Sequence, residues 1–270
     1  LQGWFLMTDT GRIVAVTGAS SGIGLAAARL FRDRGDKVYC LSRTDPKEPG
    51  ITFIHTDVTD EASVNAAFGA IGKAEGRIDV LLSNAGIGVS GAAECTTMQD
   101  AKRQLDVNFF GLHACVRAAV PLMRAHGGTI LATSSVAAVF AIPFQAFYSA
   151  SKFAVNALVL ALANELKPFN IRVAAIMPGD VKTGFTGARI KAEDDDNYGQ
   201  SVEKSVAVME RDEQNGMGPE MIAKRFVALS LKKHPKVLST VGLQYKFFCF
   251  LGKVLPIRLQ NFIVGKMYIK

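Results

Sequence analysis

The chain has 270 residues, 49% of them hydrophobic and 20% charged, and a formal net charge of +7. This size and composition predict one globular domain with a sizeable core. The four cysteines are scattered, with no CxxC pair and no histidine at metal-ligand spacing, so they argue against a disulfide framework or a metal site and fit a reducing, cytoplasmic setting.

The positive charge is concentrated at the C-terminal end. The last 50 residues carry +10, with no acidic residue after Glu220, which leaves −3 for the preceding 220 residues. Because the excess belongs to a tail, we expect no nucleic-acid partner. Residues 1–7 show neither a basic region nor a small-residue cleavage site. They are interpreted as a leader or an added extension, and secretion is not expected.

Apolar runs of strand length alternate with helical patterns from residue 12 onward. Strands are expected at 12–17, 37–42, 51–56, 78–83, 128–134 and 171–177, and helices follow most of them, including a long one over about 99–124. The strands are apolar throughout, as in a parallel sheet that helices cover on both faces. The sequence therefore predicts an α/β fold, a Rossmann-type doubly wound parallel sheet in a single domain over residues 8–270.

A long polar segment at about 184–217 follows the last predicted strand. Its acidic run, 192–200, is interpreted as a solvated surface loop or as the flank of a mobile lid over a site. We expect the whole segment to act as a lid that orders on binding.

The first strand runs into the glycine-rich stretch "TGASSGIG", residues 17–24, which opens a helix. Glycine allows a tight turn and a close approach of the backbone to a pyrophosphate, whose charge the free N–H groups of a helix N-terminus favour. A dinucleotide is therefore expected at this loop. Its contacting residues would be Gly18, Ser20, Ser21, Gly22, Ile23 and Gly24.

The second strand ends in Ser42 and Arg43. At this position a dinucleotide-binding domain contacts the 2′ position of the adenosine ribose. An acidic residue there would repel a 2′-phosphate, whereas a guanidinium makes charge-assisted bonds to it. The pair favours NADP(H) over NAD(H). The alternative is that Arg43 is a solvated loop residue.

Several motifs occur in order and together resemble the short-chain dehydrogenase/reductase family. They are "TGASSGIG" at 17–24, "DV" at 57–58, "SNAG" at 83–86, "VN" at 107–108, "SS" at 134–135, "YSASK" at 148–152 and "PG" at 178–179, followed by Val181 and Thr183. The resemblance covers about residues 11–183. One small departure is Ser83, where the family more often has asparagine.

The resemblance implies further cofactor contacts. Asp57 and Val58 would lie at the adenine, and Asn84, Ala85 and Gly86 would form the loop on the adenosine side. The loop of Pro178, Gly179, Val181 and Thr183 would hold the nicotinamide carboxamide and phosphates, and Tyr148 and Lys152 would also contact the cofactor. Without the family, Asp57 would more often be a helix N-cap and Asn84 a turn residue.

Tyr148 and Lys152 lie one helical turn apart, a spacing that brings both side chains to one face. Interconversion of an alcohol and a ketone requires a proton on the oxygen, and a free tyrosine has a pKa of about 10. The charge of Lys152 is expected to lower that pKa, so that Tyr148 acts as general acid or base. Taken alone, the pair is usually packing with a snorkelling lysine.

Two more residues complete the expected catalytic group. Ser135, at a strand end, would hydrogen-bond the substrate oxygen and orient it, although a serine there is also a common cap. The resemblance implies that Asn108 holds a water that connects the lysine to solvent.

An apolar stretch after Ser135 suggests the substrate class. We expect a wall of Val136, Val139, Phe140, Ile142, Phe144 and Phe147, of which half simply pack the core in the alternative interpretation. Such a wall suits a hydrophobic alcohol or ketone better than a sugar, because hydroxyls desolvated without partners are costly.

The C-terminal segment 241–270 replaces the glycine-rich ending of fatty-acid-synthesis reductases and looks more like that of hydroxysteroid- or retinol-type members. Its apolar residues and lysines predict an amphipathic helix pair broken at Pro256. Three interpretations remain open: packing on the protein's own core, peripheral membrane contact, or an oligomer contact.

The sequence thus predicts an NADP(H)-dependent oxidoreductase of a steroid-, retinoid- or lipid-like secondary alcohol or ketone, and a homodimer or homotetramer. The alternatives are a reductase of smaller carbonyls or 3-oxoacyl thioesters and a non-catalytic NADP(H)-sensing protein. The substrate itself, the direction and the oligomeric state are not fixed by the sequence.

Overall fold

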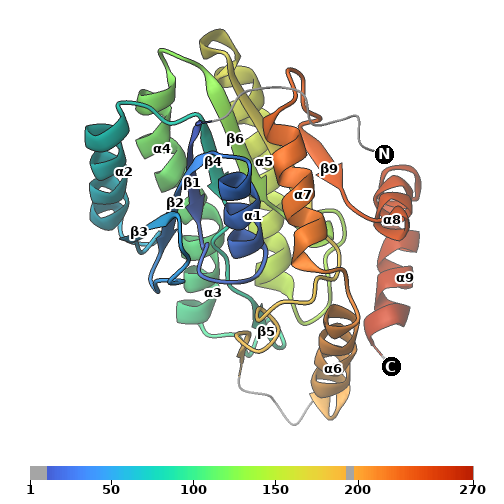
Figure 1. Cartoon of the computed structure of the whole chain (residues 1–270). Coiled ribbons are helices and arrows are strands. Elements are labelled where there is room, and N and C mark those ends of the chain that lie inside the picture. Colours follow the sequence, from blue (N-terminus) through green and yellow to red (C-terminus); the bar gives the residue numbers. More distant parts are fainter. Residues whose placement is uncertain (1–10, 193–197, 270) are drawn as a thin grey trace.

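The computed structural model describes residues 11–192 and 198–269 (Figure 1). The expected leader or extension over residues 1–7 and the centre of the acidic run, residues 193–197, lie outside this part of the chain.

A single parallel sheet forms the centre of the molecule. Its strands are β1 (Ile13–Thr17), β2 (Lys37–Ser42), β3 (Ile51–His55), β4 (Val80–Ser83), β6 (Gly128–Thr133), β7 (Ile171–Met177) and β9 (Leu238–Thr240), in the order β3-β2-β1-β4-β6-β7-β9. Every neighbouring pair is parallel. The order reverses between β1 and β4, which is where ligands of open α/β sheets bind.

Helices cover both faces of this sheet, which confirms the doubly wound prediction. Helices α1 (Gly22–Asp33) and α7 (Pro219–Ser230) lie on one face, and α2 (Glu61–Glu75), α4 (Gly111–Met123) and α5 (Ala146–Glu165) lie on the other (Figure 1). Strand β1 shows why the strands are apolar throughout. Its Val14 and Val16 pack in the core between the sheet and α1 and α7. Its Ile13 and Ala15 point to the other face and pack in the core beneath α2, α4 and α5.

The predicted long helix over 99–124 is interrupted. Helix α3 (Met98–Leu105) passes into a π-helical turn, Asp106–Phe110, before α4 begins. Such turns are rare and occur mostly at functional sites. The turn contains Asn108.

Several shorter elements lie over the carboxyl ends of the strands. Short strands β5 (Val89–Ser90) and β8 (Ile190–Lys191) pair with each other, and α6 (Ser201–Gln214) follows in the segment expected to be a lid. The 3-10 turns are Val136–Ala138 and Lys167–Phe169.

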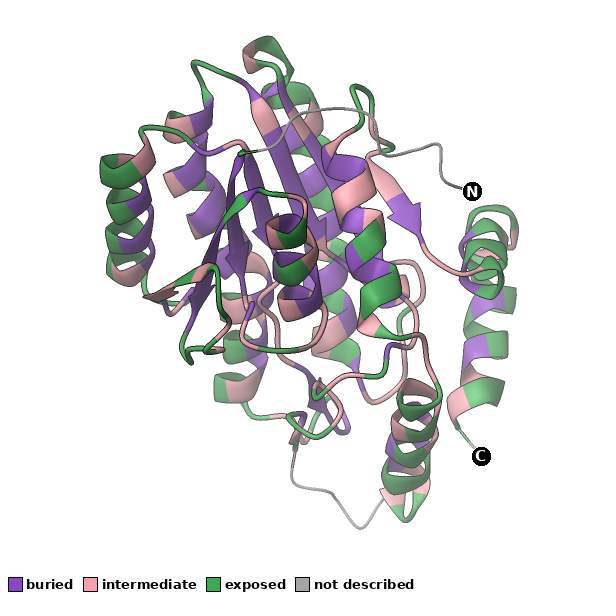
Figure 2. Cartoon of the chain, viewed as in Figure 1, coloured by how far each residue is buried: buried purple, intermediate pink, exposed green. Residues whose placement is uncertain are grey.

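The C-terminal segment forms the predicted helix pair. Helices α8 (Leu243–Val254) and α9 (Ile257–Tyr268) are separated at Pro256 and stand along one side of the molecule (Figure 1). In Figure 2 the central strands of the sheet are buried, whereas the edge strand β3 is only partly buried and much of both helices is exposed.

Candidate active site

A cavity of about 1070 Å³ lies along the carboxyl ends of the strands. It collects most of the residues that the sequence marked, from the glycine-rich loop through Arg43, Asp57, Asn84, Ser135 and Tyr148 to Thr183. Of the predicted catalytic and cofactor-binding residues, Gly24 and Asn108 are the two that do not line it. Both lie directly behind its wall, as their contacts show.

The glycine-rich loop is shaped by close contacts that exclude side chains. Gly18 has φ of +64°, and a Cβ there would lie 2.8 Å from the Cα of Ala85. A Cβ on Gly24 would lie 2.4 Å from the carbonyl oxygen of Gly18. Gly24 therefore supports the loop from behind, and glycine is required at both positions.

The first turn of α1 presents backbone donors at this loop. Its N-cap residue, Ser21, has extended backbone and no side-chain capping hydrogen bond. The first turn of a helix has N–H groups without intrahelical partners, and these favour an anion. The bare backbone and the free donors fit the pyrophosphate of a dinucleotide.

The expected ribose end of the cavity is lined by Ser42, Arg43 and Asp57. The Ser42 hydroxyl donates to the carbonyl of Thr44 at 2.7 Å, and Arg43 is exposed. Partial burial alone would raise the pKa of Asp57, but bonds from Thr59 and the charges of Arg43 and His55 lower it. The N-cap of α2 is Asp60 rather than Asp57, so the capping alternative for Asp57 is wrong.

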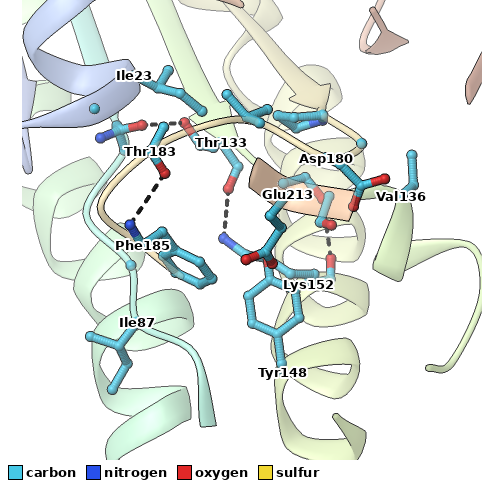
Figure 3. Close-up of a pocket in the computed structure, with 18 of the residues that line it drawn as sticks. Ile23, Ile87, Thr133, Val136, Tyr148, Lys152, Asp180, Thr183, Phe185 and Glu213 are labelled. Atoms are coloured by element: carbon cyan, nitrogen blue, oxygen red, sulfur yellow. Dashed lines mark hydrogen bonds between the residues drawn. The ribbon is translucent and has the colours of Figure 1, made fainter. Parts of the chain in front are cut away.

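Asn84 links the glycine-rich loop to the catalytic helix. Its Nδ2 donates to the carbonyl of Gly18 at 3.3 Å, and its Oδ1 accepts from the Thr133 hydroxyl at 3.0 Å. The carbonyl of Thr133 in turn accepts from Lys152 Nζ at 2.9 Å (Figure 3). One continuous set of hydrogen bonds thus runs from the expected phosphate loop to the lysine.

Tyr148, Ser135 and Lys152 line the same cavity. Burial raises the pKa of Tyr148 to about 12, while a hydrogen bond with Ser135 and the charge of Arg189 act in the opposite direction. Lys152 Nζ lies 5.7 Å from the centre of the Tyr148 ring. Burial lowers the pKa of Lys152 to about 8.

These pKa directions differ from the sequence prediction. Lys152 was expected to lower the pKa of Tyr148, but desolvation of the phenol outweighs its neighbours and the pKa rises. At neutral pH the site therefore holds a protonated phenol beside a protonated lysine. A protonated phenol is ready to donate a proton.

Asn108 holds the π-helical turn against the site. Its Oδ1 accepts from the backbone N–H of Ile87 at 2.8 Å, and its Nδ2 donates to Ile87 O at 3.1 Å and to the Ser151 hydroxyl at 3.0 Å. It is buried, and a Cβ on Gly86 would lie 3.3 Å from its Oδ1. Asn108 thereby ties the 83–86 loop to α5.

The segment expected to be a lid contributes residues that sequence reasoning missed. Phe185 lies with its ring centre 5.9 Å from that of Tyr148. Glu213 of α6 lines the cavity (Figure 3). Its carboxylate pairs with buried Arg189 and accepts a hydrogen bond from Thr186. The only signal for this pair was a long polar segment, because partners 24 residues apart have no fixed spacing.

The apolar wall is confirmed only in part. Val136, Phe140 and Ile142 line the cavity, whereas Val139, Phe144 and Phe147 do not. Phe144 instead packs edge-on against Tyr198 at 6.0 Å between ring centres. The alternative, that half of these residues pack the core, is not confirmed either, because Val139, Phe144 and Phe147 are only partly buried and belong to neither core cluster.

The C-terminal helices complete the cavity instead. Their inner faces line it with Gln244, Tyr245, Phe248, Leu251, Leu255, Gln260, Ile263, Val264, Met267 and Tyr268. A Cβ on Gly252 would lie 2.5 Å from Val139 Cγ1, so α8 packs directly on the segment after Ser135. The inner face of this helix pair therefore covers the cavity and packs on the segment after Ser135.

Two general findings bear on the class of chemistry and on α5. Within residues 11–192 and 198–269, no group of three or more His, Cys, Asp or Glu side chains is placed to hold a metal ion.

Helix α5 is long and apolar enough to cross a membrane by length and composition. It packs on β7 and carries Tyr148 and Lys152, as a core helix does.

Comparisons with known proteins identify the family. The model for short chain dehydrogenases matches residues 12–194. The 3-ketodihydrosphingosine reductase of Bacteroides thetaiotaomicron is 39% identical over 236 residues, or 86% of this chain and 88% of that protein. The 17-beta-hydroxysteroid dehydrogenase type 1 of Mus musculus is 38% identical over 191 residues, which are 64% of this chain and 55% of that protein. The solved structure of a short-chain dehydrogenase from Streptomyces avermitilis matches with a TM-score of 0.84 and 27% identity. The match covers 96% of this chain and 98% of that chain. The chain belongs to the short-chain dehydrogenase/reductase family and is an oxidoreductase with hydroxysteroid-dehydrogenase-like relatives.

Proposed function

We propose that this oxidoreductase uses NADP(H) to interconvert a hydrophobic secondary alcohol and the corresponding ketone. The observation that carries the proposal is the meeting of Ser135, Tyr148 and Lys152 in one cavity with the glycine-rich loop. A binding protein has no chemical need for all three. This argues against the alternative of an NADP(H) sensor.

The cofactor would lie along the carboxyl ends of β1, β2 and β4. The turn at Gly18–Gly24 would hold the pyrophosphate, and Arg43 the 2′-phosphate. Asp57 and Val58 would contact the adenine, Asn84, Ala85 and Gly86 the adenosine side, and the 178–183 loop the nicotinamide. When bound, the cofactor supplies or accepts the hydride.

The chain's own residues handle the proton and the oxygen. In reduction the Tyr148 O–H bond breaks and its proton passes to the substrate oxygen, while Ser135 donates a hydrogen bond that orients that oxygen. The charge on Lys152 stabilises the phenolate that Tyr148 becomes. Asn108 acts as a positioning residue because it ties the 83–86 loop to the helix that carries Tyr148.

The pKa values support ketone reduction near neutral pH. A phenol with a pKa of about 12 is protonated there, as a general acid must be. Oxidation needs the phenolate and is favoured only at higher pH.

The substrate is proposed to be a steroid-, retinoid- or long-chain lipid ketone. Apolar side chains of α8 and α9 line the substrate end of the cavity, and the ring of Phe185 lies tilted against that of Tyr148. Two relatives are named for a long-chain keto-sphingoid and for a steroid. Smaller carbonyls and 3-oxoacyl thioesters are the alternative within enzymes.

We propose a cytoplasmic homodimer or homotetramer, joined through the long helical segments that carry Asn108 and Tyr148. Exposed Phe153 and Leu160 on α5 support such a contact.

The test is NADPH oxidation at 340 nm by the full chain with steroid, retinoid, long-chain, short-chain and thioester ketones, and with NADH in parallel. Turnover of the bulky apolar ketones with NADPH is expected. Turnover of the thioester alone would assign the smaller-carbonyl alternative. Tight NADPH binding with no turnover of any ketone would favour the sensor.

A further inference from the structure

The pair of helices α8 and α9 has two apolar faces, and only one of them is covered. The inner face lines the cavity, and Tyr245, Cys249, Gln260 and Val264 are buried there. The outer face lies in solvent along one side of the molecule (Figure 2). A helix packed on its own core needs only one such face.

The exposed apolar residues of the described chain gather on these two helices. Five large ones are scattered over α3, the π-helical turn, α5 and α7. Eleven lie in the last 27 described residues: Leu243, Phe247, Phe248, Phe250, Val254, Ile257, Leu259, Phe262, Ile263, Met267 and Ile269. Phe248, Ile263 and Met267 of this set line the cavity, which leaves eight exposed apolar residues that do not. A concentration of exposed apolar side chains of this kind marks an interaction site.

A regular stripe runs along α8. Leu243, Phe247, Phe250 and Val254 follow one another at intervals of four, three and four residues, which places them on one side of a helix. Their exposed fractions are 84%, 57%, 58% and 56%. None of the four lines the cavity. We call these four residues the outer stripe.

The charged residues of α8 and α9 themselves are all positive. Lys246, Lys253, Arg258 and Lys266 are exposed, and no acidic residue occurs between 243 and 270. A second copy docked across a two-fold axis would bring these like charges together. An anionic bilayer surface complements them and accepts the apolar side chains.

We propose that the outer face of α8 and α9 docks on an anionic lipid membrane, from which the apolar substrate passes into the cavity beneath. The delivery step rests on the proposed function, whereas the docking does not. One face of these helices is exposed and the other lines the cavity. Phe248, Leu251 and Leu255 lie on the cavity side of α8, within a turn of the outer stripe. A substrate leaving the bilayer would meet apolar side chains over this whole path.

The docking test is flotation of the full chain with vesicles of phosphatidylcholine, with and without phosphatidylserine. Wild type should float with the anionic vesicles. The double variant Phe247→Glu, Phe250→Glu should bind them at least about tenfold more weakly, because it places charge in the interface. Met221→Glu is the matched control, since it changes an exposed apolar residue on α7. It should float like wild type.

A second pair of variants tests the charges. Lys246→Glu with Lys253→Glu should lower binding to anionic vesicles about tenfold or more and leave the weak binding to neutral vesicles unchanged. Lys73→Glu, an exposed lysine on α2, should change neither. If Met221→Glu or Lys73→Glu lost as much binding to anionic vesicles as the test variants, or if wild type did not float, the docking proposal would be overturned.

Sedimentation of the same proteins separates membrane docking from self-association. If the outer-stripe variant lowers the oligomer mass and wild type does not float, the face is an interface between copies and the proposal fails. We expect instead that the outer-stripe variant keeps the oligomer mass of wild type and no longer floats with the anionic vesicles.

Turnover tests the delivery step. The outer-stripe variant should reduce a short, water-soluble ketone as wild type does, and a long-chain ketone presented in anionic vesicles at least about fivefold more slowly. Equal rates for both ketones would overturn delivery. Flotation without turnover of any ketone would support docking and refute the proposed function and the delivery step.

Discussion

Tyr245 of α8 and Asp180 of the loop after β7 are joined by a hydrogen bond in which the phenol donates to the carboxylate at 2.7 Å. The ring of Tyr245 also covers Gly179, where a Cβ would lie 2.0 Å from its Cε1. The loop that we propose holds the nicotinamide is therefore fixed by a residue 65 positions later, in the helix that walls the substrate side. Changes in α8 should reach the active site through this contact.

The variant Tyr245→Phe tests that connection. It leaves the half-buried Asp180 carboxylate without its phenol partner, which should lower the free energy of unfolding by about 1–2 kcal/mol. Because the loop loses its support, the KM for the ketone should rise about fivefold while kcat changes little. Thermal unfolding and steady-state kinetics measure both. Tyr39→Phe is the control, because it removes a similar bond to Glu75 far from the cavity. An equal rise in KM for the control would show that the effect is general destabilisation.

A second prediction concerns the pH dependence of ketone reduction. Below pH 8 the phenol of Tyr148 and the ammonium of Lys152 are both protonated. As pH rises through about 8, Lys152 loses its charge and no longer stabilises the Tyr148 phenolate. The value of kcat/KM for reduction should thus be constant near neutrality and fall above about pH 8. A profile that rises between pH 8 and 10 would contradict this assignment.

Replacement of Tyr148 by phenylalanine removes the general acid. General acid catalysis contributes about 100- to 10,000-fold, so we expect a loss of kcat of about 1,000-fold. The affinity for NADPH, followed by its fluorescence, should stay close to that of wild type. Near-normal turnover would refute the role of this residue.

Burial of Lys152 should make the protein less stable at neutral pH. The folded pKa of about 8 lies below the ordinary 10.5, so the folded state resists protonation. The penalty is about 3 kcal/mol below pH 8 and disappears as pH rises to 10.5, because the unfolded chain then loses its proton too. Lys152→Met should therefore be more stable than wild type at pH 7, by about 2 kcal/mol once the lost bond to Thr133 is subtracted.

The pH dependence of that difference is the measurement. Urea unfolding of both proteins should show the advantage of Lys152→Met shrinking between pH 8 and 10.5. Lys73→Met changes an exposed lysine on α2, and its difference from wild type should not vary with pH in this way. A constant advantage for Lys152→Met would mean that Lys152 titrates normally.

Two helical glycines give a matched pair for the packing of the C-terminal helices. A Cβ at Gly252 would meet Val139 at 2.5 Å and Phe140 at 3.0 Å, whereas a Cβ at Gly265 meets nothing within 4 Å. Alanine favours a helix over glycine by about 0.5–1 kcal/mol. Gly265→Ala should therefore raise the melting temperature slightly, and Gly252→Ala should lower it and raise the KM for bulky ketones. Equal stabilisation by both would show that α8 does not press on the segment after Ser135.

Much of the fold could be predicted because its signals are local. Apolar runs predicted six of the seven central strands, and strand β9 was missed because a three-residue segment such as Leu238–Thr240 has no pattern of its own. The strand exists because β7 offers it a parallel partner. The π-helical turn at 106–110 was missed for a similar reason, since it depends on bonds from Asn108 to Ile87 and Ser151.

The candidate site divides in the same way. Motifs with fixed spacing brought nearly all the expected cofactor residues to one cavity. The substrate side could not be assigned from spacing, because it is assembled from the segment after Ser135, the Glu213 region and the C-terminal helices. The pKa of Tyr148 was predicted in the wrong direction because a sequence gives the neighbour Lys152 but not the extent of burial.

The cofactor preference depends on Arg43, an exposed residue that lines the expected ribose end of the cavity. A guanidinium bonded to the 2′-phosphate contributes about 1.5–3 kcal/mol, and an aspartate there repels the phosphate and accepts a ribose hydroxyl instead. Arg43→Asp should therefore lower the ratio of kcat/KM for NADPH to that for NADH by about 100-fold. Lys47→Asp makes the same change of charge at an exposed position of the same loop, away from the cavity. It should alter the ratio less than about threefold, because a diffuse surface charge is screened by salt. If both variants shift the ratio equally, the preference comes from the general charge of the loop. An unchanged ratio in Arg43→Asp would remove Arg43 from the cofactor site.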